Sequence, residues 1–152
     1  GSLRYALACK KRGDNVVGMI ALEMLGFYVD EPGLQGYPPP LDLVYLEVGN
    51  FIGFVSNFDS GPLVKKTIRY FRKSSSFPSE GLVGPTFING VDFSDHWSFW
   101  QAGYPALMVT DTAFFRNKHY HQPTDTPDKL DYNRLARVIV GLAHTVEKLA
   151  NE

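Results

Sequence analysis

The sequence predicts an α/β sandwich of three layers, with helices on both faces of a mostly parallel sheet. Two observations support this class. Apolar segments of strand length alternate along the chain with amphipathic segments of helical length. In addition, residues 16–27 are almost continuously apolar, as expected of a strand buried on both faces of a sheet. With 152 residues, of which 44% are hydrophobic, the chain is long enough to form a single domain, residues 1–152, with a core of its own.

The predicted elements follow a regular order from the N-terminus. A short amphipathic helix covers residues 3–12, and the strand at 16–27 follows it, with the carboxylate of Glu23 inside the strand. The segment 28–40 is rich in Pro and Gly and is expected to be irregular. The next elements are a strand at 50–55, a helix at 62–73, a strand at 82–88, a helix that Ser94 caps and that runs to residue 101, and a strand at 105–110.

The last part of the chain combines a long connection with a terminal helix. Residues 111–130 are predicted to lack regular structure, and connections of this length are usually functional. Asp131 then caps an amphipathic helix. The side chains of this helix that are expected to face the core are Leu135, Val138, Ile139, Leu142, Val146 and Leu149.

Charge and hydropathy argue against several classes of protein. The net charge is −1 and both signs are interspersed, which gives no support for binding nucleic acid or an anionic membrane. The apolar runs are far shorter than the roughly 20 residues that cross a bilayer. The first residues do not resemble a signal peptide, and the only cysteine, Cys9, cannot form an intrachain disulfide. We expect a soluble protein without a signal or anchor in this chain, and its compartment stays open.

Three residues with metal-binding or catalytic chemistry are expected at one edge of the sheet. Ligands of open parallel sheets bind beyond the carboxyl ends of the strands. Glu23 lies near the end of the first strand, Asp95 opens a helix after a loop, and His121 lies in the loop after the strand 105–110. A carboxylate in an apolar strand is costly unless it is paired or binds a cation, and carboxylate with imidazole is typical of hydrolytic zinc. The alternatives for Glu23 are a buried ion pair, for example with Arg116, or an outward-facing edge position.

The loop around His121 contains residues that can hold it in place. The segment 124–127, Thr-Asp-Thr-Pro, can fold into an Asx or Ser/Thr turn, and Asp125 can accept the second ring N–H of His121. His119 is a competing ligand that spacing does not separate from His121. Arg116 either contacts a substrate or pins this loop to Asp111.

The aromatic side chains of the segment 97–100 are interpreted as structural. Trp97, Phe99 and Trp100 are expected to form core and pocket wall rather than a cofactor site. Among them, Trp97 is the candidate for contact with a substrate.

The blocks ALEMLGFY, SDHWSFWQAGYPALMVTDTAFFRNKHYH and DTPDKLD resemble the C-terminal half of the co-catalytic zinc aminopeptidase family. That family includes aminopeptidase Y, the secreted bacterial aminopeptidases, glutamate carboxypeptidase and glutaminyl cyclase. The resemblance covers nearly the whole chain, and the order and spacing of the linked blocks make it specific. It implies a zinc-exopeptidase-like fold that is incomplete in this chain, and a peptide as substrate.

The resemblance also implies roles for individual residues. In active members two zinc ions share a bridging carboxylate and bind the hydroxide that attacks the N-terminal peptide bond. By motif, His121 is a zinc ligand, Tyr120 stabilises the oxyanion, and Asp95 lies near the metal centre. Glu23 takes a ligand position at which most relatives have aspartate.

Several groups that are essential in that family belong to motifs that are not found among these 152 residues. The His-x-Asp ligand, the bridging aspartate and the Glu-Glu pair with its general base are not found here. Glu23 and His121 are two protein ligands, whereas a catalytic zinc ion usually has three. We therefore expect part of a longer zinc aminopeptidase, inefficient alone and prone to self-association through exposed strand edges. The alternatives are a glutaminyl cyclase-like acyltransferase with one zinc ion and a non-catalytic receptor or interaction domain.

Overall fold

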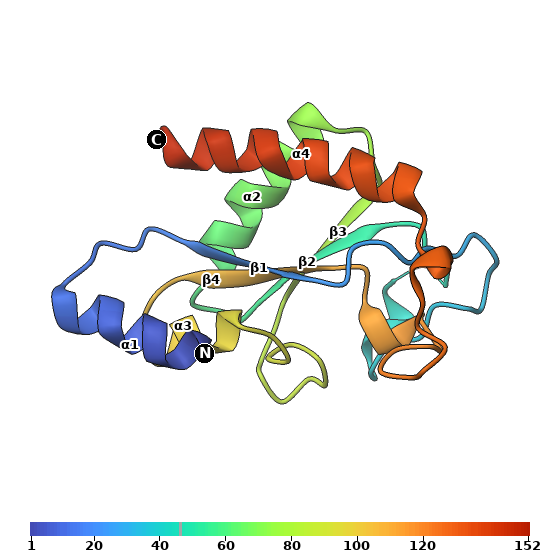
Figure 1. Cartoon of the computed structure of the whole chain (residues 1–152), viewed down its shortest axis with the longest axis horizontal. Helices are drawn as coiled ribbons and strands as arrows, with labels where there is room; N and C mark the ends of the chain where they lie inside the picture. The colour runs from blue at the N-terminus through green and yellow to red at the C-terminus, as the bar shows by residue number, and fades with distance from the viewer. Residues whose placement is uncertain (46) are drawn as a thin grey trace.

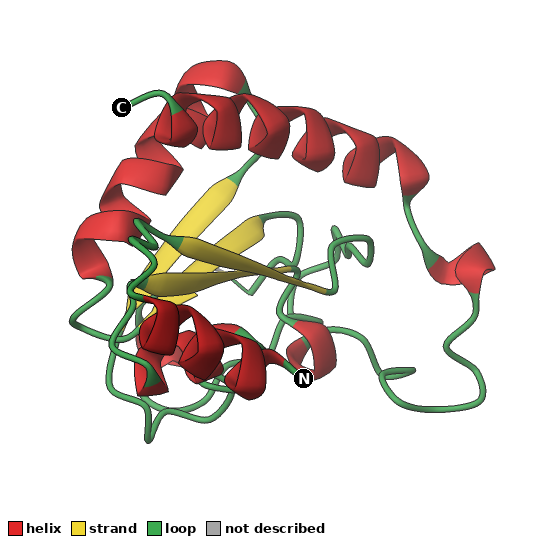
Figure 2. Ribbon diagram, turned by 60° about the vertical axis from the view of Figure 1, so that its left-hand side comes forward, coloured by secondary structure: helices red, strands yellow, loops and turns green. Residues whose placement is uncertain are grey.

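The computed structural model describes residues 1–45 and 47–152 and contains helices on both faces of one sheet. Helices α2 and α4 cover one face, and α1 and α3 cover the other (Figure 1); a second view shows the strands between the two helical layers (Figure 2). This confirms the predicted α/β sandwich. The elements are α1 (Ser2–Arg12), β1 (Met19–Glu23), β2 (Ile52–Ser56), α2 (Gly61–Ser74), β3 (Ser79–Val83), α3 (His96–Gln101), β4 (Ala106–Thr110) and α4 (Tyr132–Ala150).

The four strands lie in the order β1-β4-β2-β3. β1 pairs with β4 in parallel and β2 pairs with β3 in parallel, whereas β2 and β4 are antiparallel. The carboxyl ends of β1 and β4 therefore lie at the same edge as the amino ends of β2 and β3. The loops after β1 and β4 and the segment before β2 gather at this end of the molecule (Figure 1, right). The sheet is thus mostly parallel as predicted, but only two of its strands have their carboxyl ends at this edge.

One row of paired residues runs across all four strands at this edge. Glu23 on β1 pairs with Thr110 on β4, Thr110 with Gly53 on β2, and Gly53 with Glu80 on β3. We call these four residues the edge row. Directly paired residues project to the same face of a sheet. Because the alternate residues Ile52 and Val109 pack under α2 and α4, the edge row faces the opposite side, which carries α1 and α3.

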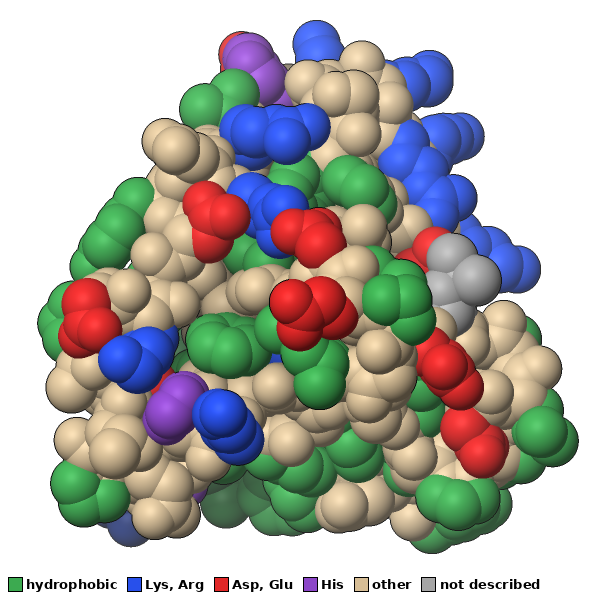
Figure 3. All heavy atoms as spheres, turned by 90° about the vertical axis from the view of Figure 1, so that its right-hand side faces the viewer, with side chains coloured by type: hydrophobic (Ala, Val, Ile, Leu, Met, Phe, Trp, Pro, Cys, Tyr) green, Lys and Arg blue, Asp and Glu red, His purple; other side chains and the backbone are tan. Residues whose placement is uncertain are grey.

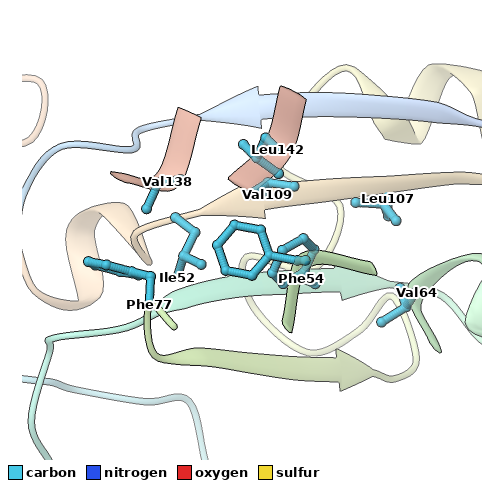
Figure 4. Packing of buried hydrophobic residues seen from close by; sticks show 9 residues of the cluster. Ile52, Phe54, Val64, Phe77, Leu107, Val109, Val138 and Leu142 are labelled. Carbon is cyan, nitrogen blue, oxygen red and sulfur yellow. The ribbon is translucent and has the colours of Figure 1, made fainter. Parts of the chain in front are cut away.

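The main hydrophobic core fills the space between the sheet and helices α2 and α4 (Figure 4). Phe54 of β2 meets Phe71 of α2 edge-on, with ring centroids 5.3 Å apart, a favourable arrangement for aromatic rings. A smaller cluster under α1 and α3 contains Ala6, Phe99 and Ala106. The buried position of Phe99 confirms its structural interpretation.

Several predicted boundaries are wrong. The strand expected at 16–27 is limited to Met19–Glu23, so that Glu23 is its last residue, and Met24 then adopts a left-handed φ of 54°. The strand expected at 82–88 is Ser79–Val83, because these are the five residues that pair with β2. It ends before Pro85, which has no backbone N–H to donate to a sheet. The connection 111–130 contains short 3-10 helices at Ala113–Phe115 and Pro127–Lys129.

The terminal helix begins as predicted. The Asp131 carboxylate accepts a hydrogen bond from the backbone N–H of Arg134 at 2.9 Å, which is the expected N-cap. Val138 and Leu142 lie in the main core, as the periodicity indicated (Figure 4). Among the described residues, no helix is sufficiently long and apolar to cross a membrane.

The facing of α4 differs from the prediction at two positions. Ile139 and Val146 are 51% and 50% exposed, whereas Gly141 and Thr145 are buried. Gly141 permits a close approach to α2, since a Cβ atom there would lie 2.6 Å from a ring carbon of Phe71. The contact between the helices therefore follows the small residues, and the two larger apolar side chains point outward.

Candidate functional site

The edge row forms the floor of an open pocket on the α1 and α3 side of the sheet. The next row, Val55, Leu82 and Met108, continues this floor. The pocket is open on one side, and its empty volume of about 760 Å³ includes the solvent space at its mouth. Its walls are loop residues, most of them aromatic or apolar: Tyr37, Pro38, Leu41, Tyr45, Phe51, Val91, Phe93, Ala113, Phe114, Phe115 and Tyr120.

Glu23 and Tyr120 lie together at one end of this pocket. Glu23 is half-buried at the end of β1, where its Oε2 accepts a hydrogen bond from the Ser94 hydroxyl at 3.1 Å. Burial raises the pKa of the Tyr120 phenol, and the negative charge of Glu23 raises it further. The structure thus brings the end of β1 close to the loop after β4. The meeting of Glu23, Asp95 and His121 that the strand-end argument predicted stays a prediction, because neither Asp95 nor His121 lines this pocket. Ser94 bonds Glu23 here and does not cap α3, whose N-cap is Asp95.

The ring of His121 lies on the ring of Tyr120. The two centroids are 3.9 Å apart and the planes are inclined by 20°. His121 is exposed and has a left-handed φ of 57°, which is uncommon for a residue with a side chain. The stacking places the imidazole beside the phenol of Tyr120, which lines the pocket, whereas His121 itself does not line it.

Backbone strain is concentrated around this end of the sheet. Among the described residues, the non-glycine positions with positive φ are Met24, Thr112, Ala113 and His121. Met24 follows β1, and the other three lie in the loop after β4. Each such conformation costs of order 1–3 kcal/mol and persists only when surrounding contacts impose it. Such strain is typical of sites whose geometry has a function.

Arg116 anchors the loops that surround the pocket. It is only 6% exposed and does not line the pocket. Its Nε donates to Gln35 Oε1 at 2.7 Å, and its Nη1 donates to the carbonyl oxygens of Phe27 and Phe51 at 3.3 and 3.1 Å. Burial lowers the pKa of Arg116 to about 10, against the opposing effect of Asp111. The ion pair with Glu23 that the sequence left open is not formed, because the guanidinium is engaged by these other groups.

Asp111 and Gln35 complete this support; the sequence named Asp111 as a possible partner of Arg116 and gave no indication of Gln35. The Asp111 carboxylate is fully buried and accepts backbone N–H groups from Phe27 at 2.8 Å and Ala113 at 3.0 Å. Burial raises its pKa, although these hydrogen bonds act in the opposite direction. Gln35 lies buried in the irregular segment 28–40, where no pattern marks it. Asp111 follows a strong strand directly, and that position was the one available signal.

The other candidates lie outside the pocket. Asp95 is exposed and makes no side-chain capping bond, and Trp97 is partly exposed on α3; neither residue lines the pocket. Asp125 accepts a hydrogen bond from Asn117 Nδ2 at 3.3 Å. Its expected contact with His121 is not among the recorded hydrogen bonds of the described residues. The roles inferred for these three side chains stay predictions.

His119, the competing ligand, is held by its own loop. Its Nδ1 is hydrogen-bonded to the hydroxyl of Thr124 at 2.9 Å. Thr124 belongs to the turn segment that was expected to support His121. The turn therefore contacts the other histidine of the pair.

The donor chemistry at the site fits part of a zinc centre. A carboxylate oxygen of Glu23 and an imidazole nitrogen of His121 are both ligand types that zinc accepts. Within residues 1–45 and 47–152, no three His, Cys, Asp or Glu side chains lie together in a way that could hold a metal ion. Two donors are one fewer than the three protein ligands usual at a catalytic zinc.

Comparison with known proteins defines the class. The fold of this chain occurs in solved structures: LapA aminopeptidase of Legionella pneumophila superposes with a TM-score of 0.68 at 16% identity, over 99% of this chain and 35% of that one. An aminopeptidase from Aneurinibacillus sp. strain AM-1 superposes with a TM-score of 0.60 at 22% identity, over 98% of this chain and 30% of that one. These likenesses confirm the fold.

The sequence model of peptidase family M28 matches residues 1–146, and the chain belongs to that family, which comprises zinc aminopeptidases. The chain is 43% identical to the uncharacterized protein YfbL of Escherichia coli (strain K12) over 125 residues. This aligned region covers 82% of the chain and 39% of that protein. The chain is 38% identical over 66 residues to a probable leucine aminopeptidase of Arthroderma otae, covering 41% of this chain and 18% of that protein. The chain thus spans about two fifths of its E. coli relative.

Proposed function

We propose that this chain is part of a zinc-dependent aminopeptidase that removes N-terminal residues from peptides. The observation that carries the proposal is the meeting of Glu23 and Tyr120 at one end of an apolar pocket, with His121 stacked on Tyr120. Membership of the M28 family supports it independently. The relatives are more than twice as long as the chain, so further ligands and a general base come, in this proposal, from residues of the whole protein outside these 152.

Each side chain at the site has a task in this proposal. Glu23 and His121 would hold the metal, and Ser94 would fix the carboxylate of Glu23 through its hydrogen bond. When bound, zinc supplies Lewis-acid polarisation of the scissile carbonyl and activation of a water molecule. The phenol of Tyr120, whose raised pKa keeps it protonated, would donate a hydrogen bond to the oxygen on which negative charge develops. The pocket would hold the side chain of the N-terminal residue.

Calorimetric zinc titration tests the metal-binding part of this proposal. We expect saturable binding to the chain that is lost or weakened at least tenfold in His121→Ala and in Glu23→Ala, because each removes one of two donors. His144→Ala is the matched control, since His144 is exposed on α4 away from the pocket. Binding that is equal in all four proteins, or absent from the whole protein, would contradict the proposal and favour a non-catalytic relative.

A further inference from the structure

The second carboxylate of the edge row, Glu80, lies at the opposite end of the pocket from Glu23. The two residues are on the outer strands of the four, and both line the pocket. Three strand spacings of about 4.8 Å place their Cα atoms about 14 Å apart. Within the described part of the chain, the Glu80 side chain has no recorded hydrogen bond or ion pair. The pocket thus has a half-buried carboxylate at the end remote from Tyr120 and His121.

The surroundings of Glu80 are aromatic and apolar. The rings of Tyr37 and Tyr45 stack beside it with centroids 5.6 Å apart, and the Tyr45 hydroxyl donates to the carbonyl oxygen of Gly81 at 2.9 Å. Burial raises the pKa of Tyr37 to about 12 and also raises that of Tyr45, and the charge of Glu80 contributes to both. The carboxylate thus lies near two half-buried phenols that line the same pocket.

The floor between the two carboxylates leaves space for a long side chain. Gly53 lies in the middle of the edge row without a side chain, and Val55 and Leu82 line the next row with hydrocarbon. An extended lysine side chain spans roughly 6 Å from Cα to Nζ, given C–C bonds of about 1.5 Å. A residue held at the Glu23 end can therefore direct a lysine or arginine side chain across Gly53 toward Glu80.

Figure 3, which views this end of the molecule, shows acidic and hydrophobic side chains interspersed, whereas most lysine and arginine side chains lie along the upper right.

We propose that Glu80 makes this pocket select substrates whose N-terminal residue is lysine or arginine. The inference rests on the proposed aminopeptidase function. The apolar walls would bury the methylene stem of the side chain, as amphipathic side chains prefer, and the carboxylate would pair with its cation. An acidic side chain would meet two carboxylates. A leucine side chain held at the same end is too short to reach Glu80 and would leave its charge without a partner.

A pair of nearly isosteric ligands tests this selection without catalysis. L-lysinamide and L-norleucinamide differ mainly in the ammonium group at the end of the side chain, and NMR titration of the chain follows their binding through the amide signals of Gly53 and Gly81. We expect lysinamide to bind about tenfold more tightly, as for a charge-assisted hydrogen bond. Glu80→Gln should abolish this preference, whereas Glu147→Gln, an equal change of charge on the exposed side of α4, should keep it. Equal or tighter binding of norleucinamide to the unaltered chain, or no shift at the pocket with either ligand, would overturn the proposal.

Hydrolysis by the whole protein separates this inference from the proposed function. With zinc supplied, we expect kcat/KM for a lysyl substrate to exceed that for a leucyl substrate, and Glu80→Gln to reverse the order. Faster leucyl hydrolysis that Glu80→Gln leaves unchanged would support the aminopeptidase and overturn the role of Glu80. Absence of any hydrolysis, with lysinamide binding that still depends on Glu80, would overturn the aminopeptidase and leave Glu80 as a recognition residue for cationic side chains.

Discussion

Tyr120 is the residue at which the contacts of the candidate site converge. The ring of His121 stacks on its ring, and the ring of Phe114 packs beside it at a centroid distance of 5.7 Å. Burial and the negative charge of Glu23 both raise the pKa of the Tyr120 hydroxyl. Removing only the hydroxyl should preserve these ring contacts. The substitution Tyr120→Phe therefore separates the chemistry of the phenol from its packing.

We expect Tyr120→Phe to lower kcat of the zinc-loaded whole protein by about 100-fold, the usual cost of removing one donor to an oxyanion. KM, zinc content and thermal stability should change little, because the ring remains in place. Steady-state kinetics with metal analysis gives all of these values. An unchanged kcat would show that the phenol does not act on the reacting groups.

The anchoring role of Arg116 predicts a loss of stability when it is truncated. Arg116→Ala removes the donors to Gln35, Phe27 and Phe51, and should lower the free energy of unfolding by about 3 kcal/mol. Urea denaturation measures this change, and Lys118→Ala, an exposed cation on the same loop, is the control. A stable Arg116→Ala variant with only a raised KM would support direct substrate contact.

Burial of His96 predicts a dependence of stability on pH. Its Nε2 bonds the carbonyl oxygen of Val91 at 2.7 Å inside the protein, and burial lowers its pKa from the ordinary 6.5. Below about pH 6.5 the unfolded chain binds a proton at His96 that the folded chain does not bind. The free energy of unfolding should therefore decrease as the pH is lowered, by up to about 1.4 kcal/mol per pH unit. In chemical denaturation across pH 5–7, roughly, His96→Gln should reduce this slope, whereas the exposed His144→Gln should not. Identical slopes would exclude His96 as the cause.

At the scale of elements, the close contact between α2 and α4 depends on glycine at position 141, which has no Cβ atom. A Cβ atom at Gly141 would lie 2.6 Å from the ring of Phe71 and 2.9 Å from Cβ of Ser75. In an exposed helix, replacing glycine by alanine stabilises by about 1 kcal/mol. Here we expect Gly141→Ala to destabilise by about 1–3 kcal/mol, because the buried ring must move.

Thermal and urea unfolding of Gly141→Ala test this expectation. The exposed position Ala143 on the same helix provides the control, since Ala143→Gly should cost only the intrinsic helix propensity, about 1 kcal/mol. A Gly141→Ala variant more stable than the unaltered protein would show that α4 shifts without cost.

Among the described residues, local patterns located the four α-helices and the four strands, β3 only in part, but not the 3-10 helices or how the elements pair. The apolar run 16–27 could not show that β1 ends at Glu23, because that boundary is set by the five residues that pair with β4. The antiparallel pairing of β2 with β4 also leaves no local signal. For the same reason, Glu80 could not be identified from the sequence, because it joins the site only through its pairing with Gly53. Glu23 could be singled out as a carboxylate in an apolar run, and Tyr120 through the resemblance of its Tyr-His pair to the family motif.

For the whole molecule, the outer strand β1 is an open edge with exposed apolar neighbours. Leu22 on β1 is 60% exposed, and α4, which covers the same face of the sheet, exposes Ile139 and Val146. An unpaired strand edge beside apolar side chains favours association with a second chain. We propose that the isolated 152-residue chain self-associates through this edge.

Size-exclusion chromatography with light scattering tests this association. The mass should rise with concentration, and Leu22→Lys should shift the chain toward the monomer. Leu43→Lys is the control, because Leu43 is 83% exposed and lies in a short 3-10 helix, Leu41–Leu43, that is not part of the sheet. A monomer at every concentration, or an equal effect of both substitutions, would contradict the role of β1.

The opposed directions of the two strand pairs divide the pocket between separate stretches of the chain. Glu23 lies on β1, and Tyr120 lies in the loop that follows β4. Gly53 on β2 and Glu80 on β3 both belong to the continuous segment 52–83. Substitutions within that stretch can change what the far end of the pocket accepts and leave the reacting end as it is. Relatives that share the Tyr-His pair could therefore diverge in substrate choice by altering one contiguous segment.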